Sequence, residues 1–132
     1  MSEPETIERE SATTEAAELR TMLRSFTGTV EYHAHWSGMR YTDGVKFLVE
    51  SAKAYWLLDL IASWQLEALR DAWLREFQLW ELFVRADRTA TAVCSRDSED
   101  VAFRQEIEFT DFPLDYVKVY VEGGVVLLPS EH

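Results

Sequence analysis

The spacing of apolar residues changes once along the chain, close to Phe77, and this change limits the fold more than any other feature. Before Phe77, apolar residues recur every three or four positions, as in an amphipathic helix. After it, apolar and polar residues alternate, which is typical of strands with one buried face. Helices followed by strands predict an α+β protein, in which two or three N-terminal helices pack on one face of a four- to five-stranded antiparallel meander sheet.

Three helical stretches precede the change. Residues 15–26 have amphipathic spacing and predict a short helix lying on the domain. The strongest stretch is 45–64, whose second half is apolar on nearly every face and therefore predicts a buried helix. Residues 66–75 are amphipathic again, and the pattern leaves open whether 43–76 is one helix or two.

Five strands are expected after the helices. Gly123 and Gly124 predict a two-residue hairpin turn, because glycine tolerates the positive φ angles that such a turn needs. The expected strands are 77–84, 89–95, 101–110, 117–122 and 125–128. The expected core comprises Phe47, Leu48, Tyr55, Trp56, Leu58, Ile61, Phe103, Ile107, Val117 and Val119.

Length and charge predict one acidic domain. The 132 residues suit a single domain over 15–132, and the polar, charged residues 1–14 are expected to form a disordered acidic tail. The net charge is −11, with both ends acidic and the middle balanced. Because an acidic surface repels phosphate and no basic cluster is present, direct nucleic-acid binding is not expected.

Cysteine and hydropathy point to the cytoplasm. Cys94 is the single cysteine, so no disulfide can form within the chain, and a small buried apolar residue is the favoured interpretation. The first residues are acidic, unlike a secretory signal. The longest apolar run, 54–58, falls far short of the roughly 20 residues that span a bilayer, so no membrane insertion is expected.

An aromatic loop carries the first candidate site residues, Tyr32, His33, His35, Tyr41 and Asp43. On a strand, His33 and His35 would point the same way and could share a metal with Asp43 or Glu31. Two loop histidines without a metal are the favoured interpretation, and no cofactor is expected. Residues 41–44 predict a helix cap in preference to an anion-binding loop.

Asp59 is the other unusual residue, because it interrupts an apolar helical stretch. A carboxylate in such a place must be paired or hydrogen-bonded. A buried structural anchor that accepts hydrogen bonds from a loop is favoured over a catalytic or ligand-binding acid.

Acidic residues concentrate in the C-terminal part of the chain. The candidates for an acidic interaction face are Glu106, Glu108, Asp111, Asp115 and Glu122. Such an array could mimic the phosphates of a nucleic acid and bind the basic groove of a partner protein. A solvated surface that keeps the protein soluble is the favoured interpretation of this array.

Several strings occur in the order seen in a known group of proteins: FTGT, YTDGVKFL, AYWLLD, FQLW, DFPL and GVVLLPS, all within residues 26–130. In this order they resemble an uncharacterised bacterial family that is catalogued only as a domain of unknown function and is often met on plasmids and mobile elements. The resemblance implies a bacterial or phage origin and a cytoplasmic location. It implies no activity.

The chain is therefore expected to be a small acidic bacterial accessory protein that binds a protein partner, with the acidic sheet face as the candidate surface. The alternative is a small-ligand-binding protein or an enzyme that uses the loop near 32–43 and Asp59. A third interpretation is a subunit that stabilises an assembly. The sequence contains none of the common catalytic motifs, which favours a non-enzymatic role.

Overall fold

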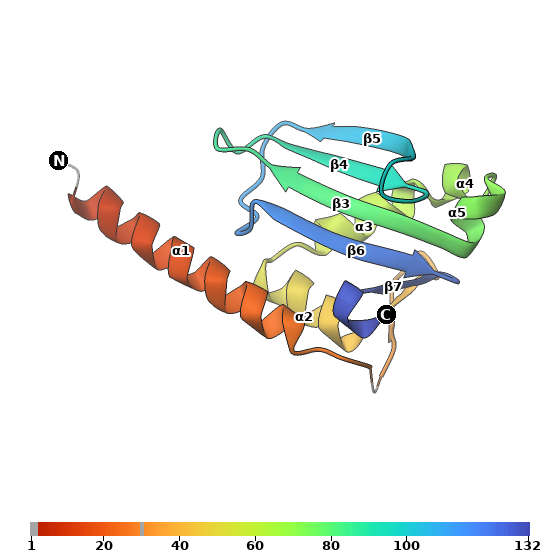
Figure 1. Ribbon diagram of the computed structural model, residues 1–132, viewed down its shortest axis with the longest axis horizontal. Helices are drawn as coiled ribbons and strands as arrows, with labels where there is room; N and C mark the ends of the chain where they lie inside the picture. Colours follow the sequence, from red (N-terminus) through yellow and green to blue (C-terminus); the bar gives the residue numbers. More distant parts are fainter. Residues whose placement is uncertain (1–2, 30) are drawn as a thin grey trace.

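The computed structural model describes residues 3–29 and 31–132, with side chains from Thr14 onward. Over these residues the chain is an α+β protein, as predicted, with five α-helices, a short 3-10 helix and one mixed sheet of seven strands. The strand order is β1-β2-β7-β6-β3-β4-β5. Figure 1 shows the part of this order from β7 to β5. The strands are β1 (His33–Ala34), β2 (Arg40–Tyr41), β3 (Phe77–Val84), β4 (Ala90–Ser95), β5 (Val101–Ile107), β6 (Tyr116–Glu122) and β7 (Val125–Leu127).

The sheet is not the simple meander that the sequence predicted. β3 pairs with β4 on one side and with β6 on the other, so that Trp80 lies opposite both Cys94 and Val119. β3 is apolar on both faces, so two flanking strands shield it better than one. Residues 108–115 carry the chain from β5 to β6, and buried Phe112 and Leu114 hold this connection in the core.

The sheet is also wider than predicted, because the N-terminal half of the chain adds two strands. β2 pairs in parallel with β7, with Tyr41 opposite Val126, and β1 pairs with β2. Neither short strand has the length that an alternating pattern needs to be recognised. Between β6 and β7, Gly123 and Gly124 have φ angles of +55° and +78°, which confirms the predicted turn.

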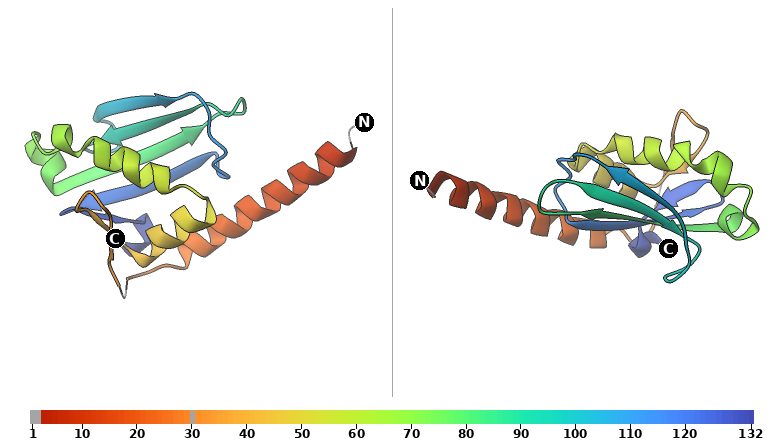
Figure 2. Two further views of the ribbon diagram at one scale, coloured as in Figure 1. Left: turned by 180° about the vertical axis from the view of Figure 1, so that it is seen from behind. Right: turned by 90° about the horizontal axis from the view of Figure 1, so that it is seen from above.

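The stretch 43–76 forms four helices, where the sequence left open one or two. They are α2 (Asp43–Ser51), α3 (Tyr55–Ser63), α4 (Gln65–Ala68) and α5 (Ala72–Glu76). Lys53 has a φ angle of +53°, which interrupts the helical backbone between α2 and α3. Asp71 caps α5 by accepting hydrogen bonds from the backbone N–H groups of Trp73 and Leu74. α3 lies across one face of the sheet (Figure 2).

The core lies between that face and the helices. Half of the expected core residues are fully buried: Leu48, Leu58, Ile61, Val117 and Val119. Four others are partly buried and pack against them: Phe47, Trp56, Phe103 and Ile107. Tyr55 was wrongly placed in the core, since it is 44% exposed. It shares a solvent-facing stripe of α3 with Asp59 and Ser63, so this helix is not buried all round. Cys94 is fully buried, and burial raises the pKa of its thiol to about 12.

α1 (Glu3–Arg24) starts earlier than the predicted helix at 15–26. Ala16 and Leu19 are buried in the core, while the N-terminal part of α1 projects beyond the body (Figure 1). The disordered tail over residues 1–14 and the single domain over 15–132 stay predictions. Within the described residues, no helix combines the length and the apolar character that crossing a bilayer requires.

Candidate functional site

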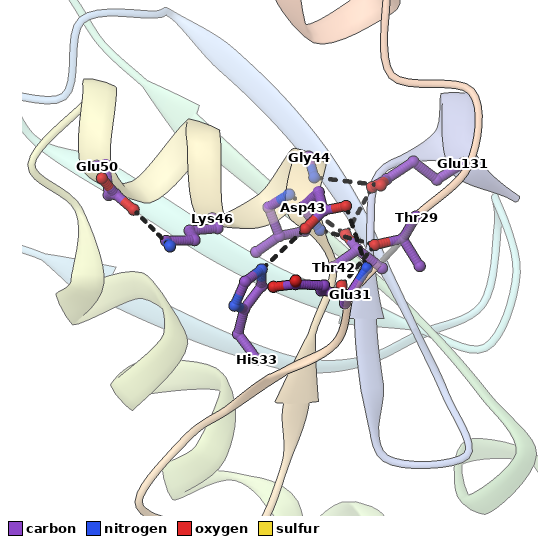
Figure 3. Close-up of polar contacts among 10 residues, drawn as sticks. Thr29, Glu31, His33, Thr42, Asp43, Gly44, Lys46, Glu50 and Glu131 are labelled. Atoms are coloured by element: carbon purple, nitrogen blue, oxygen red, sulfur yellow. Dashed lines mark hydrogen bonds and ion pairs between the residues drawn. The ribbon is translucent and has the colours of Figure 1, made fainter.

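The predicted loop residues other than Tyr32 gather where the β1–β2 hairpin meets the first turn of α2 and the side of α3. Figure 3 shows the contact of His33 with Asp43 of α2. His33 lies opposite Tyr41 in the hairpin, and their ring centroids are 5.5 Å apart. His33 and His35 each contact the carboxylate of a different helix. The hairpin is therefore fastened to α2 by one histidine and to α3 by the other.

The contact with α2 involves Asp43, the first residue of that helix. His33 Nε2 lies 2.9 Å from Asp43 Oδ1, and the backbone N–H of Glu31 donates to Asp43 Oδ2 at 3.3 Å. Thr29 Oγ1 accepts a hydrogen bond from the Asp43 N–H at 3.0 Å and donates to the Glu31 carbonyl at 2.7 Å. A carboxylate in a first helical turn is also favoured by the helix dipole. These bonds fold residues 29–33 back onto the start of α2.

The contact with α3 involves Asp59. Its Oδ1 lies 2.8 Å from His35 Nε2 and accepts a hydrogen bond from Trp36 Nε1 at 2.9 Å. The hydrogen bond from His35, followed by that from Trp36, lowers the pKa of Asp59 below its ordinary value. These are the bonds expected of a structural anchor, although the Asp59 side chain is 53% exposed and not buried. The other ring nitrogen of His35 lies 2.7 Å from Ser37 Oγ.

The two histidines do not converge on one point where a metal could bind. His33 faces Asp43 and His35 faces Asp59, on separate helices. In the described part of the chain, no three His, Cys, Asp or Glu side chains are grouped so that they could hold a metal ion.

Glu131 completes the same region, and the sequence analysis did not identify it. Its Oε1 accepts hydrogen bonds from Thr42 Oγ1 at 2.6 Å and from the Leu128 N–H at 3.0 Å, and its Oε2 accepts one from the Gly44 N–H at 3.2 Å. The Thr42 hydroxyl in turn accepts from the Val45 N–H at 3.3 Å, so the predicted cap is present. The place where an anion would bind at this helix terminus is thus taken by a carboxylate of the chain itself.

Gly44 leaves room for that carboxylate. A Cβ atom at this position would lie 2.6 Å from Glu131 Oε1 and 2.7 Å from Leu128 Cδ1. We call this region the α2 cluster, and it comprises Thr29, Glu31, His33, Thr42, Asp43, Gly44 and Glu131. No local sequence pattern could have identified Glu131, because it comes from the far end of the chain.

The second region is the face of the sheet that points away from α3. Figure 1 looks onto this outer face, and the left view of Figure 2 shows α3 on the opposite face. The strand register places these side chains of β3 and β6 on it: Phe77, Leu79, Glu81, Phe83, Tyr116, Lys118, Tyr120 and Glu122.

Aromatic pairs cross the outer face between β3 and β6. Phe83 and Tyr116 have ring centroids 5.1 Å apart and are 40% and 38% exposed, and Phe77 and Tyr120 are also 5.1 Å apart. The Tyr116 hydroxyl donates to Glu81 Oε2 at 2.6 Å. Burial, followed by this carboxylate, raises the pKa of Tyr116 above its ordinary value.

A hollow lies at the β2–β7 end of the sheet. Its volume is about 380 Å³, and its lining includes Tyr32, Arg40, Glu122 and Leu127. The Arg40 guanidinium lies over the Tyr32 ring, 5.4 Å from its centroid. Within the described residues, Arg40 makes no ion pair with a carboxylate. Tyr32 therefore lies apart from the other loop candidates, which contact α2 and α3.

The five acidic candidates are distributed over several parts of the molecule. Glu106 forms an ion pair with Arg85 at 2.9 Å, Asp115 pairs with Arg20 of α1 at 3.1 Å, and Glu122 contacts His132. Glu108 and Asp111 follow β5 and have no ion pair among the described residues. Three of the five acids thus have partners within the chain.

Comparison with known proteins assigns the chain to a family. No curated protein and no solved structure matches it significantly. A family model matches residues 17–132, which includes every candidate residue described above. The chain belongs to DUF6876, a family of unknown function.

Proposed function

We propose that this protein is an accessory protein that binds a protein partner on the outer face of its sheet. The observation that carries the proposal is the exposed Phe83–Tyr116 pair, on a sheet face that no helix of the described residues covers (Figure 1). Apolar groups exposed together on a soluble domain often mark interaction sites. Aromatic side chains are enriched at the centres of protein interfaces, where a few of them provide most of the binding energy.

The charges of the outer face suit a protein better than a nucleic acid. Lys118 lies opposite Glu81, and Arg85 pairs with Glu106, so positive and negative groups are interspersed. The whole chain carries a net charge of −11, which repels a phosphate backbone. Stacking of bases on these aromatic rings would lack the electrostatic attraction that nucleic-acid binding requires.

Arg40 provides a polar contact beside the aromatic pairs. Its guanidinium is held over Tyr32 and borders the hollow at the β2–β7 end. A carboxylate of the partner would pair with it, since guanidinium groups bind carboxylates through two parallel hydrogen bonds. Glu106 and Glu122, which have partners within the chain, would act at the rim and affect mainly the rate of association.

The alternative, a ligand site built from the loop near 32–43 and Asp59, has less support. His35, Trp36 and Asp59 contact one another, and Asp43 contacts His33. Opening this region to a ligand would first break those contacts.

The test is a comparative pulldown from bacterial lysate that has been treated with nuclease, using the wild type and the double variant Phe83→Ser/Tyr116→Ser. A matched control is Leu66→Ser on α4, which removes another highly exposed apolar side chain. We expect one stoichiometric protein to be retained by the wild type and the control and lost by the double variant. Circular dichroism checks that all three proteins are folded.

Equal retention of the same proteins by the wild type and the double variant would contradict the proposal. So would a retained species that nuclease removes, because the partner would then be a nucleic acid. Washes at increasing salt separate the two kinds of contact, since salt screens rim charges and leaves the aromatic contacts largely unaffected.

A further inference from the structure

One long edge of the sheet has no neighbour. β5 pairs with β4 on one side, and no strand of the described residues pairs with its other side. Figure 1 shows β5 as the outermost strand, with no element lying beside it. Along such an edge, alternate N–H and C=O groups point outward and can pair with another strand.

The side chains of this edge are complementary to themselves. If two copies of β5 run antiparallel with Gln105 opposite Gln105, the positions next to the axis meet suitable partners. The facing pairs are Arg104 with Glu106 and Phe103 with Ile107, and the two-fold symmetry produces each of them twice.

Among the pairings centred on residues 104, 105 and 106, only the one centred on Gln105 matches the charges. Moving the axis of symmetry to residue 104 places Arg104 opposite Arg104, and moving it to residue 106 places Glu106 opposite Glu106. Like charges that face each other directly across a strand pair are destabilising. The order Arg-Gln-Glu therefore selects the pairing centred on Gln105.

The faces of the strand agree with this register. Arg104 lies opposite Val93 and Glu106 opposite Thr91, on the outer face. Phe103 belongs to the other face, where its ring stacks on Trp64 with centroids 4.8 Å apart. A second copy related by a two-fold axis perpendicular to the sheet would keep outer face beside outer face.

Exposed groups at this edge also lack partners within the chain. Val101, the first residue of β5, is 41% exposed, and Phe109, two residues after the end of β5, is 70% exposed. Among the described residues, Arg104 has no hydrogen-bonded or ion-pair partner for its side chain. An antiparallel second copy would bring Arg104 to Glu106.

We propose that the protein forms a symmetric dimer in which the β5 strands of two copies pair antiparallel about Gln105. The two sheets then become one continuous sheet, and the edge is no longer free. This inference does not rest on the proposed partner-binding function, because it uses the edge of the sheet and not the aromatic pairs.

The test is sedimentation velocity on the full chain over a range of concentrations. The wild type should reach twice the 15.3 kDa mass of one chain. Arg104→Glu makes two glutamates face each other in both symmetric pairs, and Glu106→Arg makes two arginines face each other there. Each variant alone should raise the dissociation constant about tenfold or more.

Mixing the two variants provides the decisive measurement. In a mixed dimer paired about Gln105, both facing pairs join a glutamate to an arginine. One facing pair joins the two substituted positions, Glu to Arg, and the other joins the two unsubstituted residues, Arg104 and Glu106. An equimolar mixture should therefore dimerise with a lower dissociation constant than either variant alone.

Two further variants complete the set. The doubly exchanged variant Arg104→Glu/Glu106→Arg should also dimerise, because it restores an opposite-charge pair at both positions. The matched control is Lys118→Glu, which makes the same charge change on β6 and should remain a dimer.

A wild type that stays monomeric throughout would overturn the proposal. So would a dimer that Arg104→Glu leaves intact, or a mixture of the two variants that stays monomeric. The mixture also controls for misfolding. Glu106→Arg lacks the contact with Arg85 both alone and in the mixture, so this loss cannot explain a difference between the two samples.

Discussion

The α2 cluster and the outer face of the sheet differ in what their polar and aromatic side chains contact. In the α2 cluster, the Glu131 carboxylate meets donors from Thr42, Gly44 and Leu128, all within the chain. On the outer face, Phe83 and Tyr116 remain more than a third exposed. The first arrangement specifies how the chain folds, and the second leaves binding surface available to another molecule.

Neighbouring residues of β2 illustrate the contrast. Tyr41 is buried and lies beside His33, while Arg40 points to the opposite face and lies over Tyr32. Successive residues of a strand alternate between faces, so a two-residue strand contributes to both regions. An aromatic loop that appears as one group in the sequence is thereby divided between two faces of the fold.

Removing the carboxylate of Glu131 should have the largest effect on stability. Glu131→Ala leaves Thr42 Oγ1 and the N–H groups of Gly44 and Leu128 without an acceptor, in a partly buried place. We expect the free energy of unfolding to fall by about 3 kcal/mol. Chemical denaturation measures it.

Glu131→Gln is the matched control, because it keeps one carbonyl oxygen as an acceptor. Its free energy of unfolding should fall clearly less than that of Glu131→Ala. Equal stability of Glu131→Ala and the wild type would mean that the α2 cluster does not hold the fold together.

Asp59→Asn should have a smaller effect that depends on pH. The pKa of Asp59 is lowered in the folded protein by His35 and Trp36, so its stabilising contribution is complete above the ordinary value of 3.8. The contribution is lost as pH falls through the lowered folded pKa. At neutral pH the loss should be at most about 1 kcal/mol, because the half-exposed carboxylate is screened by water.

Thermal unfolding of Asp59→Asn and the wild type, from neutral pH to below the ordinary pKa of 3.8, provides the measurement. The difference in Tm between the two proteins should become smaller in acid. Asp111→Asn makes the same charge change on an exposed acid that lacks an ion pair among the described residues, and its Tm should equal that of the wild type throughout. A constant difference for Asp59→Asn would show that its charge is not involved.

Phe83→Ala on the outer face should change stability least. An exposed cross-strand aromatic pair contributes roughly 0.2–1 kcal/mol, so the free energy of unfolding should fall by no more than about 1 kcal/mol. Denaturant titration measures the change, with Leu66→Ala on α4 as the control for loss of an exposed side chain. A much larger loss would mean that Phe83 belongs to the packing of the fold and would remove the contrast between the two regions.

The features that could be predicted from the sequence are those that depend on residues close together in the chain. The change of period at Phe77 indicated the α+β class, and the Gly123–Gly124 turn and the Thr42 cap follow from backbone preferences of neighbouring residues. The burial of Tyr55 and Asp59 was misjudged, because a helix that is apolar on average can still keep a narrow stripe in solvent. The hydrogen bonds that Asp59 accepts from the loop are those that the sequence led us to expect.

The relations that the sequence could not predict join distant segments. Nothing local in β7 indicates that it pairs in parallel with β2, and nothing near residue 131 indicates a bond to Gly44. The position of β6 beside β3 depends on the path of residues 108–115, which buried Phe112 and Leu114 determine together with the core around them. For the candidate site, sequence spacing brought out His33 and Asp43, but not the carboxylate that completes the region.

The parallel pair of β2 and β7 has a consequence for synthesis on the ribosome. β2 joins the sheet through β7, and β7 is made after the other strands of this sheet. The β1–β2 hairpin must therefore wait, with Thr42 and Gly44 still lacking Glu131, until β7 and residue 131 have emerged. Contacts between such distant segments form slowly, because a long loop must close first. The hairpin is thus exposed to chaperones and proteases for longer than β3, β4 and β5, which can pair as they appear.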